Sequence, residues 1–308
     1  MTKRYVYHIA NVKLGIEVTE DLEINSLLSS FSPFSVNETD LSTVDCFIEL
    51  VNRRAPSRIG SETLLSDVSE VWGDRFRFFE IDKGYKTMIH DEGGFNVYVL
   101  ESNEEFSRST VYLADTDFIN SSVFTWLVMM VFGQTCLLHK VILIHASAVA
   151  VDDKSYAFLG KSGTGKSTHS RLWLEHINGA ELLNDDNPAI RLEEDGKVYL
   201  YGTPWSGKTP CYKNVKVQLG AFIRLKQAAY NRFSQKIGLE AFVNVMPSCT
   251  AIRWNRRLFQ EMNNTLEDMI RHVPVAHLEC LPNREAAQYC YENLLNININ
   301  TNSNAKIN

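Results

Sequence analysis

The sequence predicts a mixed α/β protein, with an α/β C-terminal domain preceded by a β-rich α+β N-terminal domain. Residues 1–118 hold short strand-like runs separated by turn signals. From residue 119 onward, apolar runs of helical length alternate with strand-like runs, and a glycine-rich loop joins one such strand to a helix. We therefore expect one domain at 1–118, a second at 119–295 and a frayed, asparagine-rich tail at 296–308.

The composition is that of a folded globular protein. Of the 308 residues, 44% are hydrophobic and 22% are charged, which excludes chains too polar to bury a core. The formal net charge of −6 argues against a broad nucleic-acid-binding surface, because phosphate backbones require clustered Lys and Arg. The N-terminus lacks the apolar run of a signal peptide, and the cysteines form no CxxC pair. We expect a cytoplasmic protein with reduced thiols and no nucleic-acid partner.

The N-terminal part is expected to be mostly sheet. Its strand-like runs are YVYHIANVKLGIEV, DCFIELV, RFRFFEI, GYKTMIH, FNVYVLES and STVYLAD. Gly93-Gly94 predicts a hairpin, and LEINSLLSSF before Pro33 predicts a short helix. No catalytic constellation stands in this part of the sequence, so a role in recognition or oligomerisation is the hypothesis for it.

The most apolar stretch runs from Val123 to Ile144 and is long enough to raise the question of a membrane span. Gln134, His139 and Lys140 interrupt it, and such polar groups are costly in lipid. We expect no membrane span. The prediction is a buried helix at 121–139 followed by one buried strand, VILIHASAVAV.

The glycine-rich loop is the most informative motif in the chain. The segment YAFLGKSGTGKST contains the pattern GxxxxGK[ST], with YAFLG as the preceding strand and KSTHSRLWLEHI as the following helix. This order is typical of a loop that binds the phosphates of a nucleotide. The residues expected to contact nucleotide are Gly160, Lys161, Ser162, Gly163, Thr164, Gly165, Lys166, Ser167 and Thr168.

Physical reasons support each key position of the loop. Gly163 and Gly165 allow positive φ, so that successive N–H groups can converge on phosphate oxygens at a helix N-terminus. Lys166 is expected to reach the β- and γ-phosphates, and Ser167 to place its hydroxyl on Mg²⁺. The alternative is an unused glycine-rich turn with an exposed lysine.

A pair of carboxylates follows the loop helix. The segment ELLNDDNPAIRL places Asp185 and Asp186 at the end of a predicted strand, where enzymes with such a loop need an acidic residue for the metal. The turn signalled by Asn187-Pro188 can aim both side chains at one Mg²⁺–phosphate centre, and an ordinary Asx turn is the alternative. Further along, we expect strands AIRL, KVYLYG, VQLGAFIRL and VPVAHLEC, and helices near 239–245, 255–272 and 283–295.

His145, fifteen residues before Gly160, then GKSGTGKS and then NDD form an order that resembles the catalytic domain of HPr kinase/phosphorylase. That domain shares its core with phosphoenolpyruvate carboxykinases, and the resemblance covers about residues 120–226. It implies that His145 lies beside the transferred phosphoryl group, that one Asp is the base for the acceptor hydroxyl and that the other helps to hold Mg²⁺. We assign Asp185 as the base and Asp186, with Ser167, to the metal. From the residues alone, His145 in an apolar strand is more often a satisfied core histidine.

The sequence departs from the family after the carboxylate pair. Where HPr kinases carry a Glu and an Arg in a signature strand, this chain has YLYGTPWSGKTP. Trp205 and Lys208 are therefore candidate substrate contacts, although a solvent-exposed lysine in a hairpin is equally consistent. Arg253 and Arg256 beside Trp254 are candidates for binding a phosphate or an acidic peptide, or else form a plain helix face.

These features favour an ATP- and Mg²⁺-dependent kinase that acts on a hydroxyl, expected to be a serine of a peptide or protein. The chain is also similar to lasso-peptide precursor serine kinases and to bacterial carboxykinase-like proteins, neither of which fixes the acceptor. The alternatives are a phosphotransferase of the phosphoenolpyruvate carboxykinase type and a non-catalytic nucleotide-binding sensor. Because the family forms closed assemblies, the resemblance also implies a homo-oligomer.

Overall fold

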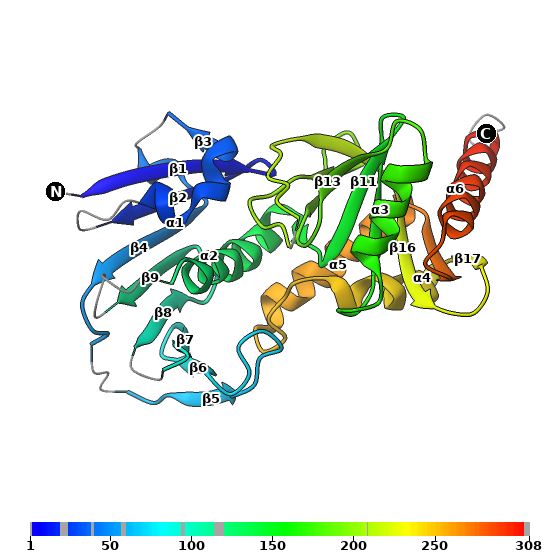
Figure 1. Ribbon diagram of the computed structural model, residues 1–308. Helices are drawn as coiled ribbons and strands as arrows, with labels where there is room; N and C mark the ends of the chain where they lie inside the picture. The colour runs from blue at the N-terminus through cyan, green and yellow to red at the C-terminus, as the bar shows by residue number, and fades with distance from the viewer. Residues whose placement is uncertain are drawn as a thin grey trace. The chain divides into compact units, whose positions relative to one another are not determined.

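The computed structural model describes residues 2–18, 24–37, 40–56, 60–93, 96–113, 120–207 and 209–304. It is a mixed α/β structure that divides into two compact units (Figure 1). The first unit comprises 1–139 and 251–259, and the second comprises 140–250 and 260–308. The boundary therefore differs from the expected one near residue 118, because the predicted apolar helix belongs to the first unit.

The first unit is built on a nine-stranded sheet among the described residues, in the order β3-β1-β2-β4-β9-β8-β7-β6-β5. The β2–β4 and β4–β9 pairs are parallel, and the other neighbours are antiparallel. The strands are β1 (Lys3–Ile9), β2 (Val12–Val18), β3 (Ser35–Val36), β4 (Cys46–Asn52), β5 (Thr63–Ser66), β6 (Phe76–Ile81), β7 (Gly84–His90), β8 (Val97–Asn103) and β9 (Arg108–Leu113). The expected predominance of sheet is thus present. Of the predicted hairpin glycines, Gly94 lies outside the described residues.

The helices of this unit are short apart from one. They are α1 (Ile24–Leu27), η1 (Ser29–Phe34), η2 (Leu41–Thr43), α2 (Ser121–Cys136) and η3 (Leu137–His139). The side chain of Asn120 caps α2 by accepting hydrogen bonds from two backbone N–H groups of its first turn. Within the described residues, the segment Ser121–His139 is the one helix with the length and composition to cross a membrane, and 67% of its most apolar window is buried inside the protein. The helix contacts β4 and β8, so its apolar side chains pack into the core as expected.

The second unit holds the predicted loop. Its sheet runs β10-β14-β15-β16-β12-β11-β13, and β18 pairs with both β16 and β17. The strands are β10 (Val141–Leu143), β11 (Ala146–Val151), β12 (Lys154–Leu159), β13 (Glu181–Asn184), β14 (Ala189–Leu192), β15 (Val198–Tyr201), β16 (Lys216–Gln227), β17 (Arg232–Lys236) and β18 (Val275–Cys280). The pairs β12–β16 and β16–β18 are parallel, so these three strands end at one edge of the sheet.

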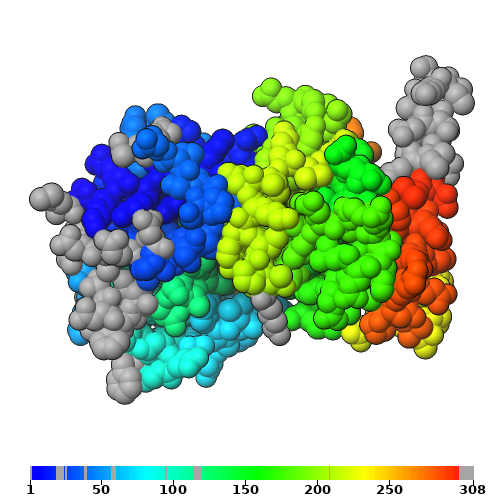
Figure 2. All heavy atoms as spheres, turned by 45° about the horizontal axis from the view of Figure 1, so that its top comes forward, coloured from blue at the N-terminus to red at the C-terminus, as the bar shows by residue number. Residues whose placement is uncertain are grey.

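The helices of the second unit are α3 (Lys166–His176), α4 (Gly238–Val245), η4 (Met246–Ser248) and α6 (Arg284–Asn304), and α5 (Arg256–His272) continues into it from the first unit. Helices α3 and α6 lie side by side (Figures 1 and 2). Their apolar side chains form one core with the sheet, centred on Trp173, Phe158 and Ile223. Helix α6 runs on to Asn304, and the last four residues of the predicted tail, 305–308, lie outside the described residues.

The predicted strand VILIHASAVAV is wrong in one respect. It is divided into β10 and β11, and His145 falls at the break. The two halves have different partners: β10 pairs with β14, whereas β11 pairs with β12 and β13. His145 therefore lies outside both strands. Because Ala146 pairs with Leu159, it stands level with the start of the loop that follows β12.

Candidate active site

The loop after β12 has the backbone of an anion cradle. Gly163 and Gly165 have φ of 79° and 98°, in the left-handed region that glycine tolerates best. A Cβ on Gly160 would lie 2.4 Å from Oγ1 of Thr164, so the loop closes tightly at its start. Gly165 is the N-cap of α3 and offers no side-chain cap, which leaves N–H groups of the first turn open to an external anion.

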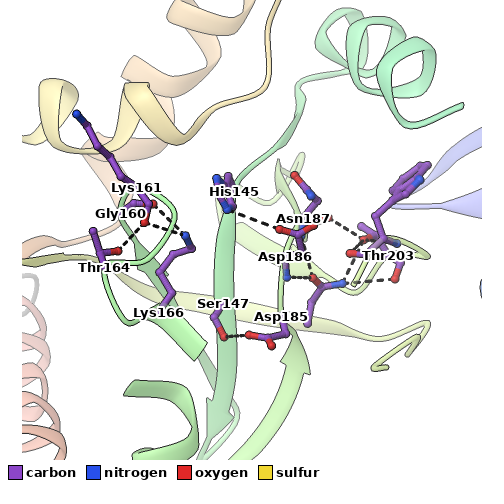
Figure 3. Close-up of polar contacts among 12 residues, drawn as sticks. His145, Ser147, Gly160, Lys161, Thr164, Lys166, Asp185, Asp186, Asn187 and Thr203 are labelled. Carbon is purple, nitrogen blue, oxygen red and sulfur yellow. Dashed lines mark hydrogen bonds and ion pairs between the residues drawn. The ribbon is translucent and has the colours of Figure 1, made fainter. Parts of the chain in front are cut away.

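Lys166 lies over this loop. Its Nζ donates to the carbonyl oxygens of Gly160 at 3.0 Å and Lys161 at 3.4 Å, and the residue is 9% exposed (Figure 3). Burial lowers the pKa of Lys166, and the charges of Asp186 and Asp185 oppose that shift. The Lys166 ammonium therefore interacts electrostatically with both predicted carboxylates.

His145 and Asp186 form an ion-pair contact beside the loop. His145 Nε2 lies 3.6 Å from Asp186 Oδ1, and both side chains are partly exposed (Figure 3). The backbone fixes this arrangement, because the N–H of His145 donates to the carbonyl of Ser248 and the N–H of Ala146 donates to that of Asp186. Burial raises the pKa of Asp186, and the charges of His145 and Lys166 oppose the rise. His145 is thus a partly exposed neighbour of Asp186 rather than a core histidine.

Asp185 has a different environment. Its Oδ1 accepts a hydrogen bond of 2.6 Å from Ser147 Oγ, and Ser147 Oγ lies 2.6 Å from Ser170 Oγ of α3. All three residues are buried. The two serines were missed in the sequence, although a serine inside the apolar run ASAVAV is a signal of a buried polar contact. This chain of hydroxyls fixes Asp185 against the loop helix.

An Asx turn holds the carboxylate pair in place. Asn184 Oδ1 accepts from the N–H groups of Asp186 at 2.9 Å and Asn187 at 3.1 Å. Asn184 Nδ2 donates to Thr203 Oγ1, and Thr203 Oγ1 donates to the carbonyl of Asn187 (Figure 3). The Asx turn, which the sequence left as an alternative, is therefore present, and it holds the backbone of the carboxylate pair.

The segment that departs from the family pattern packs against this turn. Trp205 is 5% exposed, and its carbonyl accepts from the N–H of Asn187. A Cβ on Gly207 would lie 3.0 Å from the carbonyl oxygen of Asp185. Trp205, predicted as a substrate contact, therefore has a buried, packing side chain. Lys208 lies outside the described residues.

The other predicted substrate residues are in the first unit. Arg253 and Arg256 belong to the segment 251–259 and are exposed. Trp254 lies between them in sequence, with its ring 6.0 Å from that of Phe78 in the sheet of the same unit. These two arginines therefore belong to a different unit from Lys166.

Two cavities flank the loop within the second unit. One, of about 590 Å³, is largely apolar, with Thr168, Leu172, Leu225, Ala228 and Leu281 among its lining residues. The other, of about 490 Å³, lies between residues 160–164 and the side chains of Arg224, Lys226, Gln227 and His277. Both volumes are in the range that holds small-molecule ligands.

The expected metal ligands do not form a cage of side chains. In the part of the chain that the structure describes, no group of three or more His, Cys, Asp or Glu side chains could hold a metal ion. Ser167 is exposed in the first turn of α3. Oxygen donors from a hydroxyl and a carboxylate suit Mg²⁺, which commonly takes few protein ligands together with water and substrate phosphates.

Comparison with known proteins gives a distant structural neighbour. No protein-family profile matches the chain, and no curated protein sequence matches it. Among solved structures, it is similar to the Hpr(Ser) kinase/phosphatase from Coxiella burnetii, with 15% sequence identity and a TM-score of 0.31. The alignment covers 53% of this chain and 94% of that one. At this TM-score the likeness is too weak to assign a fold or a function.

Proposed function

We propose that this chain is an ATP- and Mg²⁺-dependent kinase that transfers the γ-phosphoryl group to a hydroxyl, a serine of a peptide or protein. The observation that carries the proposal is the meeting of three features at one edge of the second sheet. These are the loop with its buried Lys166, the His145–Asp186 contact at 3.6 Å, and Asp185 held by Ser147. Phosphoryl transfer is catalysed mainly by positioning and by charge, and these groups supply both.

The residues present fit a nucleotide. The glycines of the loop and the uncapped first turn of α3 offer N–H groups to phosphate oxygens, and Lys166 adds a positive charge. The largely apolar cavity beside Thr168 and Leu172 adjoins the same loop and has room for a nucleoside. The triphosphate would thus lie on the loop with its base toward α3.

The residues also fit Mg²⁺. Ser167 and Asp185 would hold the ion, which would neutralise charge on the phosphate oxygens. Asp185 is the more suitable carboxylate because its orientation is already fixed by Ser147 and Ser170. This assignment exchanges the two roles that we inferred from sequence.

Asp186 is then the base. Its carboxylate is 39% exposed and lies against His145, so an acceptor hydroxyl can reach it. A raised pKa brings a carboxylate closer to the neutral range in which a general base works well. As the acceptor oxygen attacks the γ-phosphorus, its proton passes to Asp186 and the bond to the leaving phosphate oxygen breaks. His145 and Lys166 oppose the rise in the Asp186 pKa, which favours the ionised carboxylate before the transfer, and Lys166 offsets negative charge on the phosphates.

Transfer of label from γ-labelled ATP to serine peptides tests the proposal. We expect phosphoserine in the wild-type reaction, and a loss of about 10²- to 10⁴-fold in rate for Asp186→Asn with nucleotide binding retained. Asp195→Asn is the matched control, because Asp195 lies in an exposed turn where it pairs with Lys197 and Tyr199. Undiminished transfer by Asp186→Asn would disprove the base assignment. Absence of nucleotide binding would disprove the proposal as a whole.

A further inference from the structure

The cavity of about 490 Å³ beside the loop has a wall of basic side chains. Arg224 and His277 come from neighbouring parallel strands, β16 and β18, where they are register partners. Arg224 is also the register partner of Leu159, the last residue of β12 before the loop. The cavity therefore lies at the carboxyl ends of parallel strands, which is where open α/β sheets bind ligands.

Arg224 is a desolvated cation, and no carboxylate among the described residues forms an ion pair with it. Its Nη1 donates to the backbone carbonyl of Asn244 in α4 at 2.9 Å, and burial alone lowers its pKa. Asn244 Oδ1 also lies 3.2 Å from His277 Nδ1, so one residue braces both side chains. Lys226 differs, because its Nζ forms an ion pair with Glu279 Oε1 at 2.8 Å. Arg224 thus retains donors and charge for an external anion.

The register gives the backbone separation between Arg224 and His145, whose Nε2 lies 3.6 Å from the Asp186 carboxylate. Ala146 pairs with Leu159, which sets His145 level with Gly160 on the strand next to β12. Arg224 stands on the opposite neighbour of β12. Two strand spacings separate these positions, about 10 Å, which an extended peptide spans in about three residues.

We propose that Arg224, with Lys161, binds a carboxylate of the acceptor, so that the acceptor is an acidic peptide with Asp or Glu about three residues from the serine. The inference rests on the proposed function, since it takes the serine to lie at Asp186. An arginine guanidinium can engage a carboxylate with two parallel hydrogen bonds, which gives direction as well as charge. The exposed Lys161 faces the same cavity from the loop.

Peptide binding to the full chain with saturating Mg²⁺ and a non-hydrolysable ATP analogue tests this. The probes are fluorescent peptides with one serine and a single Glu three residues before or after it, and the same peptides with Gln. We expect the wild-type protein to bind one Glu peptide at least about tenfold tighter than its Gln counterpart. Arg224→Gln should abolish that difference, whereas Arg271→Gln, in an exposed i,i+4 pair with Glu267 on α5, should keep it.

Equal affinity of the wild-type protein for Glu and Gln peptides would overturn the inference, as would an unchanged preference in Arg224→Gln. Should Arg224→Gln fail to fold, Lys161→Gln, in an exposed loop position, must reduce the preference. The labelled-ATP assay is run on the same peptides. A Glu preference lost in Arg224→Gln without phosphoryl transfer would sustain the acidic-peptide site and reject the kinase. Phosphoryl transfer with equal kcat/KM for the Glu and Gln peptides would sustain the kinase and reject the acidic-peptide site.

Discussion

His169 should make the second unit sensitive to acid. It lies on α3, three residues after Lys166, and is 3% exposed. Trp173 Nε1 donates to its Nε2 at 3.1 Å, and the ring of Phe158 stands edge-on at 4.8 Å. Burial lowers the pKa of His169 from 6.5 to about 4. The imidazole is therefore neutral in the folded protein, and protonation would place a charge among aromatic rings.

The size of the effect follows from the two pKa values. The folded pKa lies below the unfolded one, so the stability linked to His169 is fully present above 6.5 and is lost as the pH falls toward 4. The full loss amounts to about 3 kcal/mol, of which about 2 kcal/mol falls between about pH 7 and about pH 5. This is a large share of the free energy that stabilises a typical domain.

The comparison is between the wild-type protein and His169→Gln, which keeps an acceptor for Trp173 but does not titrate. Amide hydrogen exchange of α3 at about pH 7 and about pH 5 gives the opening free energy of this unit, without assuming that the whole chain unfolds in one step. The wild-type loss should exceed that of the variant by about 2 kcal/mol. His272→Gln, at an exposed position of α5, should behave as wild type. Equal pH dependence of wild type and His169→Gln would refute the reasoning.

Three further outcomes follow. Ser147→Ala removes the hydrogen-bond donor to Asp185 in a buried site and should lower the free energy of unfolding in urea by about 1–3 kcal/mol. A loss under about 0.5 kcal/mol would show that this hydrogen bond does not stabilise the fold. Asp186→Asn should raise the melting temperature at neutral pH, because burial raises the pKa of Asp186 above 3.8 and ionisation of this carboxyl therefore costs stability. Calorimetry should show that this gain in melting temperature vanishes below about pH 3.8. A lower melting temperature of the variant at neutral pH would contradict the prediction. Gly163→Val should weaken binding of the ATP analogue at least about tenfold in calorimetric titration, because its φ of 79° strains a β-branched residue; undiminished affinity would show that the loop does not need this conformation.

Local patterns predicted the elements that carry the site. The strand, loop and helix around Gly160 and Lys166 are present as β12, the loop and α3, because glycine spacing and an apolar face are local properties of sequence. The later helices and strand near 239–245, 255–272 and 273–280 are also confirmed, within a few residues at their ends.

Long-range pairing accounts for what the sequence did not reveal. The break at His145 arises because β10 and β11 find different partner strands, and no local pattern encodes that choice. Ser147 and Ser170 come together across 23 residues of sequence. Arg224 and His277 each interrupt an apolar strand, a signal of a non-core role, but only the parallel register puts them side by side.

The discontinuous first unit has a consequence for dissecting the protein. Its second segment, 251–259, is tied into the first by buried groups: Gln134 Oε1 accepts from the N–H of Ile252, and Asn255 Nδ2 donates to the carbonyl of Glu104. The chain therefore leaves this unit after His139, re-enters it after Thr250 and leaves it again within α5. A fragment starting at residue 119 or 140 would carry 251–259 without the sheet it belongs to. A fragment that holds the second unit alone would therefore need 251–259 excised as well, with residue 250 joined to residue 260.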